Sequence, residues 1–217
     1  FLITYLTLID GRLAIAAKRV SPAGQLLDNT PINVSMNPVD TAFEPAAAFT
    51  GTRHLVVWHE DVSNDINDVV RGAFVDTDGT VSPSFVVFDE LRSLYPDQFG
   101  NFLSRPEIAV GNNRVLVVLA PRFARDVRQP SQSLYAQLLD FDGNPQLAAP
   151  LLVREDTGDN PRYPQVAFDG QSFFVAWIEG LLEEGTISAG LFGIYGREVS
   201  EAGQLINGSA ATTGLTI

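Results

Sequence analysis

Two histidines beside a cluster of carboxylates are the residues of this chain best suited to acid–base or metal chemistry. His54 and His59 flank the apolar run "LVVW" at 55–58, and "WHED" at 58–61 sets an imidazole next to two carboxylates. Such an arrangement can act as a general base or bind a metal ion. The same residues also suit the solvated polar end of a β-strand, and we expect that structural role for them.

No recognised catalytic motif accompanies these residues. The sequence contains no H-E-x-x-H pair, no G-x-S-x-G elbow and no phosphate-binding loop. With 26 aspartates and glutamates, it does not single out the carboxylate pair that a glycoside hydrolase would use. We therefore assign no catalytic residue, and the sequence favours a protein that is not an enzyme.

Metal and cofactor sites are not predicted either. "DTDG" at 76–79 and "DFDG" at 140–143 begin like a calcium loop, but neither continues with the remaining ligands of one. "SPAG" at 21–24 and "SEAG" at 200–203 fill the same place without a carboxylate pair, so we expect turns. The acidic stretch 60–68 is a better cation candidate, although a solvated loop is expected there. There is no cysteine for disulfides or thiolate ligands.

Composition limits the partners. The chain has 217 residues, 45% of them hydrophobic, which is enough for a sizeable core. Its net charge of −12 argues against nucleic acid or an anionic membrane surface as partner. No apolar run approaches the ~18 residues that span a bilayer, so no membrane insertion is expected. Because the chain opens on Phe1 without a signal-peptide pattern, we expect a processed or excised piece of a longer protein.

A glycine turn recurs four times along the chain. The copies are "IAAKRVSPAG" (15–24), "VRGAFVDTDG" (70–79), "LYAQLLDFDG" (134–143) and "IYGREVSEAG" (194–203). The final glycine supplies the positive φ of a tight hairpin turn, and the Ser or Asp three residues earlier can bond the turn backbone. A small residue seven positions before that glycine leaves room for a bulky neighbour. These small residues are Ala17, Gly72, Ala136 and Gly196.

A second element, led by proline, recurs three times. "PAAAFTG" (45–51), "PEIAVGN" (106–112) and "PQVAFDG" (164–170) are each followed by an apolar run. These runs are "LVVW" (55–58), "VLVVL" (115–119) and "FFVAW" (173–177), and each ends thirteen residues after its proline. We expect the two tryptophans that end such runs, Trp58 and Trp177, to be buried between repeating units.

Each unit thus contains a proline-led strand, an apolar strand, a strand that ends in the glycine turn and a short fourth strand. The fourth strands are "INVS" (32–35), "SFVVFD" (84–89), "PLLVRE" (150–155) and "GLTI" (214–217). A second strand that is apolar on both faces must be covered on both faces. Four-stranded units repeating every ~60 residues predict an all-β chain, a β-propeller of four-stranded antiparallel blades. We predict a single propeller segment over 1–217, with blades at 1–36, 44–89, 105–155 and 163–217.

The motifs "PQVAFDG", "FFVAWIE" and "IYGREVSEAG" resemble a propeller repeat of large secreted or surface proteins of bacteria. The resemblance covers nearly the whole chain, and blade three departs from it with Leu119 and Pro121 in place of an aromatic residue and a carboxylate. It implies a β-propeller, an extracytoplasmic location (secreted, periplasmic or cell-surface) and no catalytic residues.

Blade one is open at one edge. Phe1–Thr7, "FLITYLT", aligns with "FFVAWIE", so the blade begins on its second strand and lacks the proline-led one. An unpaired apolar strand invites association. We predict that this edge is covered, either by self-association or by further blades that complete a ring.

The loops carry the binding prediction. Loops after the second and fourth strands are long and emerge on one face, where binding residues commonly lie. The candidates are aromatic residues and arginines, types enriched at interfaces: Tyr95, Phe99, Phe102, Arg122, Phe123, Arg125 and Tyr163. Equally, these aromatic residues could pack the loops. We predict a non-catalytic binding or structural module of an exported or cell-surface protein, with a protein or glycan partner. The alternatives are a lectin-like glycan-binding propeller and, third, a glycoside hydrolase or lyase.

Overall fold

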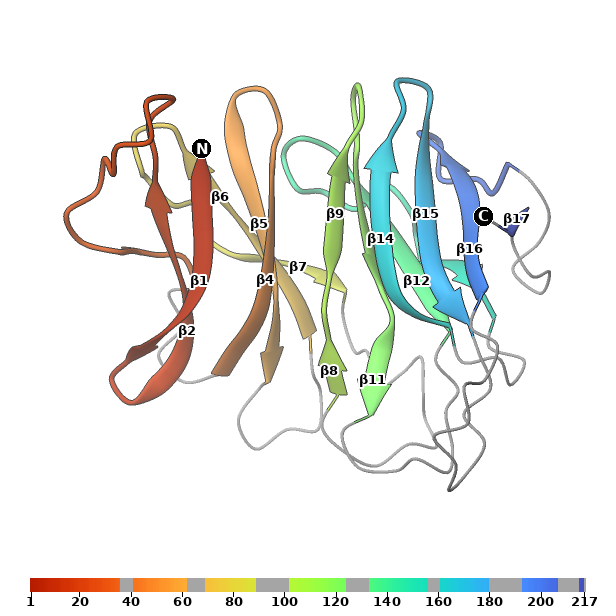
Figure 1. The fold of residues 1–217 in the computed structure, drawn as a ribbon, viewed down its shortest axis with the longest axis horizontal. Coiled ribbons are helices and arrows are strands. Elements are labelled where there is room, and N and C mark those ends of the chain that lie inside the picture. The colour runs from red at the N-terminus through yellow and green to blue at the C-terminus, as the bar shows by residue number, and fades with distance from the viewer. Residues whose placement is uncertain are drawn as a thin grey trace. The chain divides into compact units, whose positions relative to one another are not determined.

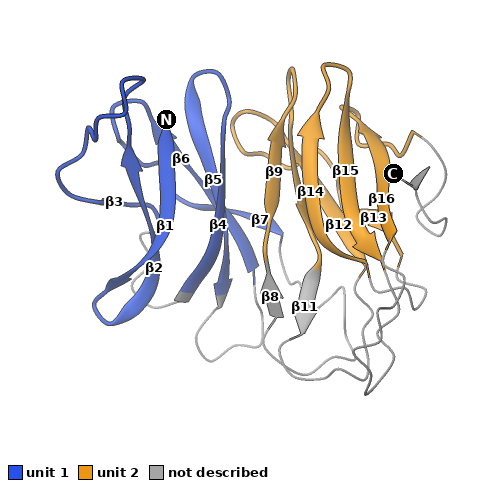
Figure 2. Ribbon diagram, in the orientation of Figure 1, with its two compact units in different colours: residues 1–96 blue, residues 97–217 orange. Residues whose placement is uncertain are grey.

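The computed structural model describes residues 1–35, 41–61, 69–88, 102–123, 133–155, 161–179, 193–206 and 215–216. In these ranges the regular structure consists of seventeen strands, with no helix and hence no helix able to cross a membrane (Figure 1). The chain divides into two compact units, residues 1–96 and 97–217 (Figure 2). Each unit is described by itself below.

Unit 1 holds two antiparallel sheets, which correspond to blades one and two. The first sheet has the order β1-β2-β3, and the second has the order β4-β5-β6-β7. Among the residues that the structure describes, blade one therefore has no first strand, as predicted from the sequence. The bounds are β1 Leu2–Ile9, β2 Arg12–Arg19, β3 Ile32–Asn33, β4 Thr41–Phe49, β5 Arg53–Asp61, β6 Val69–Asp76 and β7 Phe85–Phe88.

Unit 2 holds blades three and four. Blade three has the order β9-β10-β12-β13, with a separate two-stranded pair of β8 and β11, and blade four has the order β14-β15-β16-β17. The bounds in blade three are β8 Phe102–Ser104, β9 Glu107–Val110, β10 Val115–Leu119, β11 Pro121–Phe123, β12 Leu134–Leu139 and β13 Leu151–Arg154. Those in blade four are β14 Arg162–Phe168, β15 Ser172–Glu179, β16 Gly193–Ser200 and β17 Leu215–Thr216.

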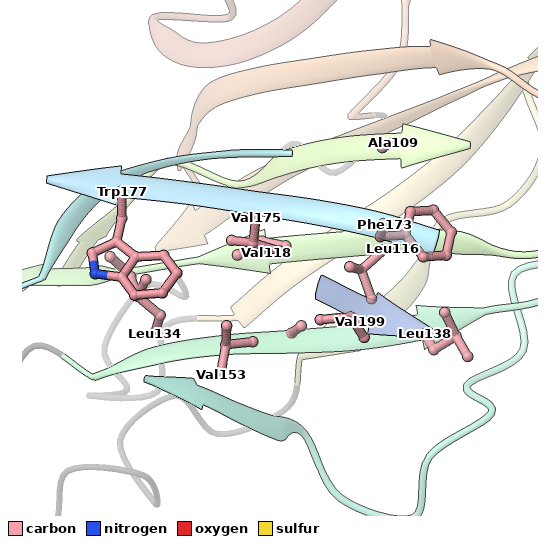
Figure 3. Close-up of a cluster of buried hydrophobic side chains, with 12 residues drawn as sticks. Ala109, Leu116, Val118, Leu134, Leu138, Val153, Phe173, Val175, Trp177 and Val199 are labelled. Carbon is pink, nitrogen blue, oxygen red and sulfur yellow. The ribbon is translucent and has the colours of Figure 1, made fainter. Parts of the chain in front are cut away.

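The core of each unit lies between its two blades. In unit 2, side chains from β10, β12 and β13 meet side chains from β15 and β16 (Figure 3). In unit 1, Ile15 and Val34 of blade one pack with Val56 and Trp58 of blade two. Trp58 and Trp177 are both fully buried, which confirms the prediction made for them.

The glycine turns also confirm their prediction. Gly24, Gly79, Gly143 and Gly203 have φ values of 79°, 96°, 88° and 75°. In the turn at 140–143, Asp140 Oδ1 accepts hydrogen bonds from the backbone N–H groups of Asp142 (2.9 Å) and Asn144 (2.8 Å). Burial raises the pKa of Asp140, but the hydrogen bonds from Asn144 and Asp142 outweigh it, so the pKa lies below its ordinary value. This carboxylate therefore organises its own turn.

The small residues of the third strands differ in the space that neighbouring side chains leave for a Cβ atom. A Cβ at Gly72 would lie 2.9 Å from the Phe85 ring, and one at Gly196 would clash with the Phe174 ring. Phe85 lies directly opposite Gly72 on the fourth strand. Ala17 is faced by Thr4 and Ile32, and Ala136 is faced by Val118 and Leu151, none of which is aromatic. The glycines thus make room for an aromatic ring that lies across the strand.

The contact between Arg19 and one glycine turn allows a test of what a turn glycine contributes to stability apart from its positive φ. Arg19 binds Asp28 through its side chain and donates from Nη1 to the Thr77 carbonyl at 2.7 Å, which ties blade one to the glycine turn of blade two. A Cβ at Gly79 would lie 3.2 Å from the guanidinium carbon, whereas a Cβ at Gly24 would meet nothing within 4 Å. We expect Gly24→Ala to lower the free energy of unfolding by about 1 kcal/mol. Gly79→Ala should cost more, because Arg19 must also move; equal losses in urea unfolding would contradict this.

The edge of blade one is open among the described residues. β1 pairs only with β2, whereas the equivalent strands β5, β10 and β15 are each paired on both sides. Phe1 is 78% exposed and Ile3 is 52% exposed. Coverage of this edge by another chain or by further blades stays a prediction.

A second copy of the chain is the partner that can be tested directly. Because β1 offers unpaired backbone groups and apolar side chains, we expect the 217-residue chain to self-associate in a concentration-dependent way. Ile3→Lys, which puts a charge on the edge, should shift the species towards monomer in sedimentation-velocity experiments. Thr52→Lys, in the exposed β4–β5 turn, is the matched control. A wild-type chain that stays monomeric at high micromolar concentration would refute the expectation.

Candidate functional site

The first strands of blades two and four share an irregularity at their proline. In β4 the pairing passes from Phe43 opposite His59 to Ala46 opposite Val57. In β14 it passes from Arg162 opposite Ile178 to Gln165 opposite Ala176. Two residues of the first strand, one of them proline, therefore face a single tryptophan of the second strand. This is a β-bulge, a feature found often next to active sites, where it re-aims a side chain.

The residue before each of these prolines has an unusual backbone conformation. Glu44 has φ 48° and Tyr163 has φ 53°, both in the left-handed region. This conformation costs a non-glycine residue of order 1–3 kcal/mol unless its surroundings enforce it. Here the following proline disfavours the right-handed region, and the bulge fixes the chain on either side. Both side chains point outward: Glu44 is exposed and Tyr163 is 55% exposed.

In unit 2 two first strands lie next to each other. β9 and β14 pack side by side (Figure 1), and a Cβ at Gly111, just after β9, would lie 3.2 Å from the ring of Phe168 in β14. The two proline-led strands of unit 2 are therefore neighbours, and the offset between their prolines relates the residues of one strand to those of the other. Residue 105 corresponds to 163, and residue 107 corresponds to 165.

These equivalent positions carry a mixed polar and aromatic set. Arg105 and Glu107 form an ion pair on blade three, with 3.3 Å between Nε and Oε1. The Arg105 side chain is 71% exposed and that of Glu107 is 18% exposed. On blade four, Tyr163 and Gln165 are both exposed. We call Arg105, Glu107, Tyr163 and Gln165 the first-strand surface.

The first-strand surface offers groups that bind polyhydroxylated molecules. An aromatic ring with a polar tip can pack on an apolar face, while carboxylate, guanidinium and amide groups bond hydroxyls. No group of three or more acidic or histidine residues suited to a metal ion occurs in the described part of the chain.

A second set of carboxylates is buried. Glu179 accepts hydrogen bonds from Trp177 Nε1 and from Arg154 Nε, both at 2.6 Å. Arg154 and Glu179 are only 1% and 3% exposed. In blade two, Glu60 likewise accepts from Trp58 Nε1 (3.2 Å) and from Arg71 Nε (2.5 Å). These carboxylates stabilise the blades and are closed to a substrate.

The two buried sites take their cation from different strands. Arg154 lies on the fourth strand of blade three and reaches across to blade four, whereas Arg71 lies on the third strand of blade two, directly opposite Trp58. At the position of Arg154, blade one carries Ser35, whose Oγ accepts a hydrogen bond from Ile15 N at 3.0 Å. The buried glutamate therefore pairs with an arginine of a neighbouring blade only where that blade carries an arginine at this position.

Arg197 extends the buried network in unit 2. Its Nη1 donates to the Val153 carbonyl at 2.9 Å, so it also joins blade four to blade three. Burial lowers the pKa of Arg197, and the positive charge of Arg154 lowers it further, while Glu179 acts in the opposite direction.

The "WHED" segment does not form the solvated strand end expected from the sequence. β5 continues to Asp61, and His59 and Glu60 are both buried. The His59 ring stacks on Phe43 with 5.9 Å between centroids. His54 is half-buried against Phe49, and burial lowers its pKa below the ordinary value. The expectation of solvation was wrong because the strand, with its cover, extends further than the apolar run.

The loop residues predicted to bind are only partly described. Tyr163 is exposed on the first-strand surface, while Phe102, Arg122 and Phe123 lie on the paired strands β8 and β11. Tyr95, Phe99, Arg125 and the stretch 62–68 fall outside the described residues. The binding role of all seven stays a prediction. Sequence reasoning missed Glu44, Arg105, Glu107 and Gln165, although their fixed places around the recurring proline were a usable signal.

Comparison with known proteins gives a structural match. No family model and no curated protein sequence matches the chain. The arabinanase Arb43A of Bacillus subtilis has a TM-score of 0.57 at 9% identity, over 100% of this chain and 75% of the arabinanase. The GH43 endo-arabinanase of Bacillus licheniformis has a TM-score of 0.54 at 12% identity, over 99% and 74%. The GH32 β-fructofuranosidase BmSUC1 of Bombyx mori has a TM-score of 0.56 at 15% identity, over 94% of this chain and 45% of that enzyme.

These matches establish the fold class. The neighbours are β-propellers, and the chain is an all-β propeller of antiparallel blades, as predicted. They also correct the functional expectation. The prediction of a non-catalytic binding or structural module is overturned, because the solved structures that share the fold over nearly the whole chain are glycoside hydrolases.

The buried ion pairs allow a quantitative test. We expect Arg154→Met to lower the free energy of unfolding by about 3–5 kcal/mol, since it leaves the buried Glu179 without its cation. Arg71→Met should cost clearly less, because the Arg71 side chain is 27% exposed and water can reach the site. The double variant Arg154→Met/Glu179→Gln should recover part of the loss. Urea unfolding of the three variants measures this, and similar small losses for both single variants would count against the argument.

Proposed function

We propose that this chain is the propeller of a glycoside hydrolase that cleaves furanosidic bonds. The supporting observation is the shared fold, at TM-scores above 0.5, with several arabinanases and a β-fructofuranosidase. One neighbour is an exo-1,5-α-L-arabinanase. A 1,5-linked arabinose has its O5 in the linkage, so its ring must close through O4 and be a furanose. Both kinds of neighbour therefore act on five-membered sugar rings.

Glycoside hydrolysis requires two carboxyl groups, one that protonates the leaving oxygen and one that acts as base or nucleophile. In unit 2, Glu107 is our candidate for one of them, because it lies on a first strand beside the recurring proline and is not fully buried. Glu60 and Glu179 are unsuitable, since both are buried and already accept hydrogen bonds from tryptophan and arginine.

The remaining functional expectations fit such an enzyme. A glycan becomes the partner, as its substrate. The extracytoplasmic location implied by the sequence resemblance suits an enzyme that meets polysaccharides outside the cell. The net charge of −12 matches a neutral saccharide better than an anionic polymer.

Release of reducing sugar tests the proposal. The purified chain should hydrolyse linear 1,5-arabinan, arabino-oligosaccharides or sucrose. Glu107→Gln should lower kcat by about 10²–10⁴-fold, the usual contribution of a general acid or base. Glu155→Gln, at an exposed carboxylate after β13, is the matched control and should keep wild-type activity. No activity on any of these furanosides in the folded chain would overturn the proposal.

A further inference from the structure

The residue before the first-strand proline keeps its place in the repeat while its chemistry changes. It is Glu44 in blade two, Arg105 in blade three and Tyr163 in blade four. Positions that only hold the blades together behave differently: Trp58 and Trp177, each with a glutamate two residues later, repeat as a set. Glu44 and Tyr163 share a left-handed backbone conformation at a bulge, whereas Arg105, just before β9, has no positive φ. All three residues are exposed, so the chemistry that this position presents to solvent changes from blade to blade.

The backbone conformation at Tyr163 is unfavourable for a tyrosine. At φ 53°, glycine or asparagine would meet less backbone strain than tyrosine. The tyrosine side chain does not repay that strain through burial, since it is 55% exposed while the following Pro164 is buried. The bulge opposite Trp177 therefore holds an aromatic ring out towards solvent.

Polar groups able to orient a ligand lie at the equivalent places. Gln165 is exposed two residues further along β14, and the Arg105–Glu107 ion pair lies on β9, the adjacent first strand. An aromatic face with an amide, a carboxylate and a guanidinium group matches a sugar ring, which has an apolar face and hydroxyls around its edge.

We propose that Tyr163 is the stacking platform of a saccharide subsite on the first-strand surface, with Gln165 and the Arg105–Glu107 pair bonding the sugar hydroxyls. The choice of an arabinofuranose oligomer as ligand rests on the proposed function. Tyr163 is a binding residue in this proposal and takes no part in bond cleavage.

Stability and affinity should change in opposite directions on substitution. Tyr163→Asn relieves the backbone strain, so the melting temperature should stay constant or rise, while the Kd for arabinohexaose in isothermal titration calorimetry should rise about tenfold. Tyr163→Phe keeps the ring and should hold Kd within about threefold of wild type. Phe49→Ala, at an exposed aromatic residue near the end of β4, should leave Kd unchanged. A lower melting temperature for Tyr163→Asn with unchanged Kd would overturn the subsite and assign Tyr163 to the bulge.

The same variants separate this proposal from the proposed function. If the chain hydrolyses arabinan, Tyr163→Asn should raise KM about tenfold with kcat nearly constant, and an unchanged KM would refute the subsite while hydrolysis stands. If the chain hydrolyses no furanoside yet binds arabinohexaose through Tyr163, the subsite is supported and the proposed function fails. Wild-type protein that shows no binding to arabinohexaose at millimolar concentration overturns the subsite.

Discussion

The second strand of each blade is the element on which the structure depends, because it is apolar on both of its faces. Every residue of β10 is buried, and β5 and β15 each place a tryptophan in the core between two blades. Such a strand gains its burial only when it is paired on both sides within a sheet and covered above and below by other elements. A blade is therefore not an independent folding unit, and each unit of this chain is built from a pair of blades with a shared core. β1 is the exception: it is paired on one side only, and its residue Ile3 and the preceding Phe1 remain exposed.

The tryptophans and the charged residues beside them enter this apolar packing as hydrogen-bonded sets. The indole N–H of each tryptophan needs an acceptor, and a glutamate two residues later on the same strand, hence on the same face, provides it. Burying that carboxylate in turn requires a cation, and Arg154 or Arg71 supplies one. Blade three lacks the whole set. Leu119 takes the tryptophan position and Pro121 takes the glutamate position, so no buried carboxylate is present there that requires an arginine. The repeat therefore varies in linked groups of residues.

The repeat made the fold predictable, and its absence elsewhere made the site hard to predict. The turn glycines and the thirteen-residue step from proline to tryptophan are local patterns with a direct backbone meaning, so they indicated both the strands and the blades. The extent of burial was harder to predict, because the cover over His59 and Glu60 comes from other strands, and the "WHED" segment read as a solvated end. The bulge was also invisible in composition: it arises from pairing two residues of one strand with a single tryptophan of the next, which the sequence of either strand does not state. Function proved least predictable, since the shared blade motif is structural and the exposed residues proposed to contact a ligand are the ones that vary.

The bulge connects these two kinds of residue. Proline and the facing tryptophan are constrained by packing, and together they force the residue before the proline into a left-handed conformation that packing alone does not reward. The packing of the proline and the tryptophan therefore maintains the strained conformation. The side chain of the residue before the proline lies outside the core. Glu44 and Tyr163 show that the same backbone can present a carboxylate in one unit and an aromatic ring in the other. A repeat that fixes where a side chain emerges, without fixing its identity, lets one architecture acquire different chemistry at equivalent points. This separates the packing that stabilises a blade from the side chain that the blade exposes.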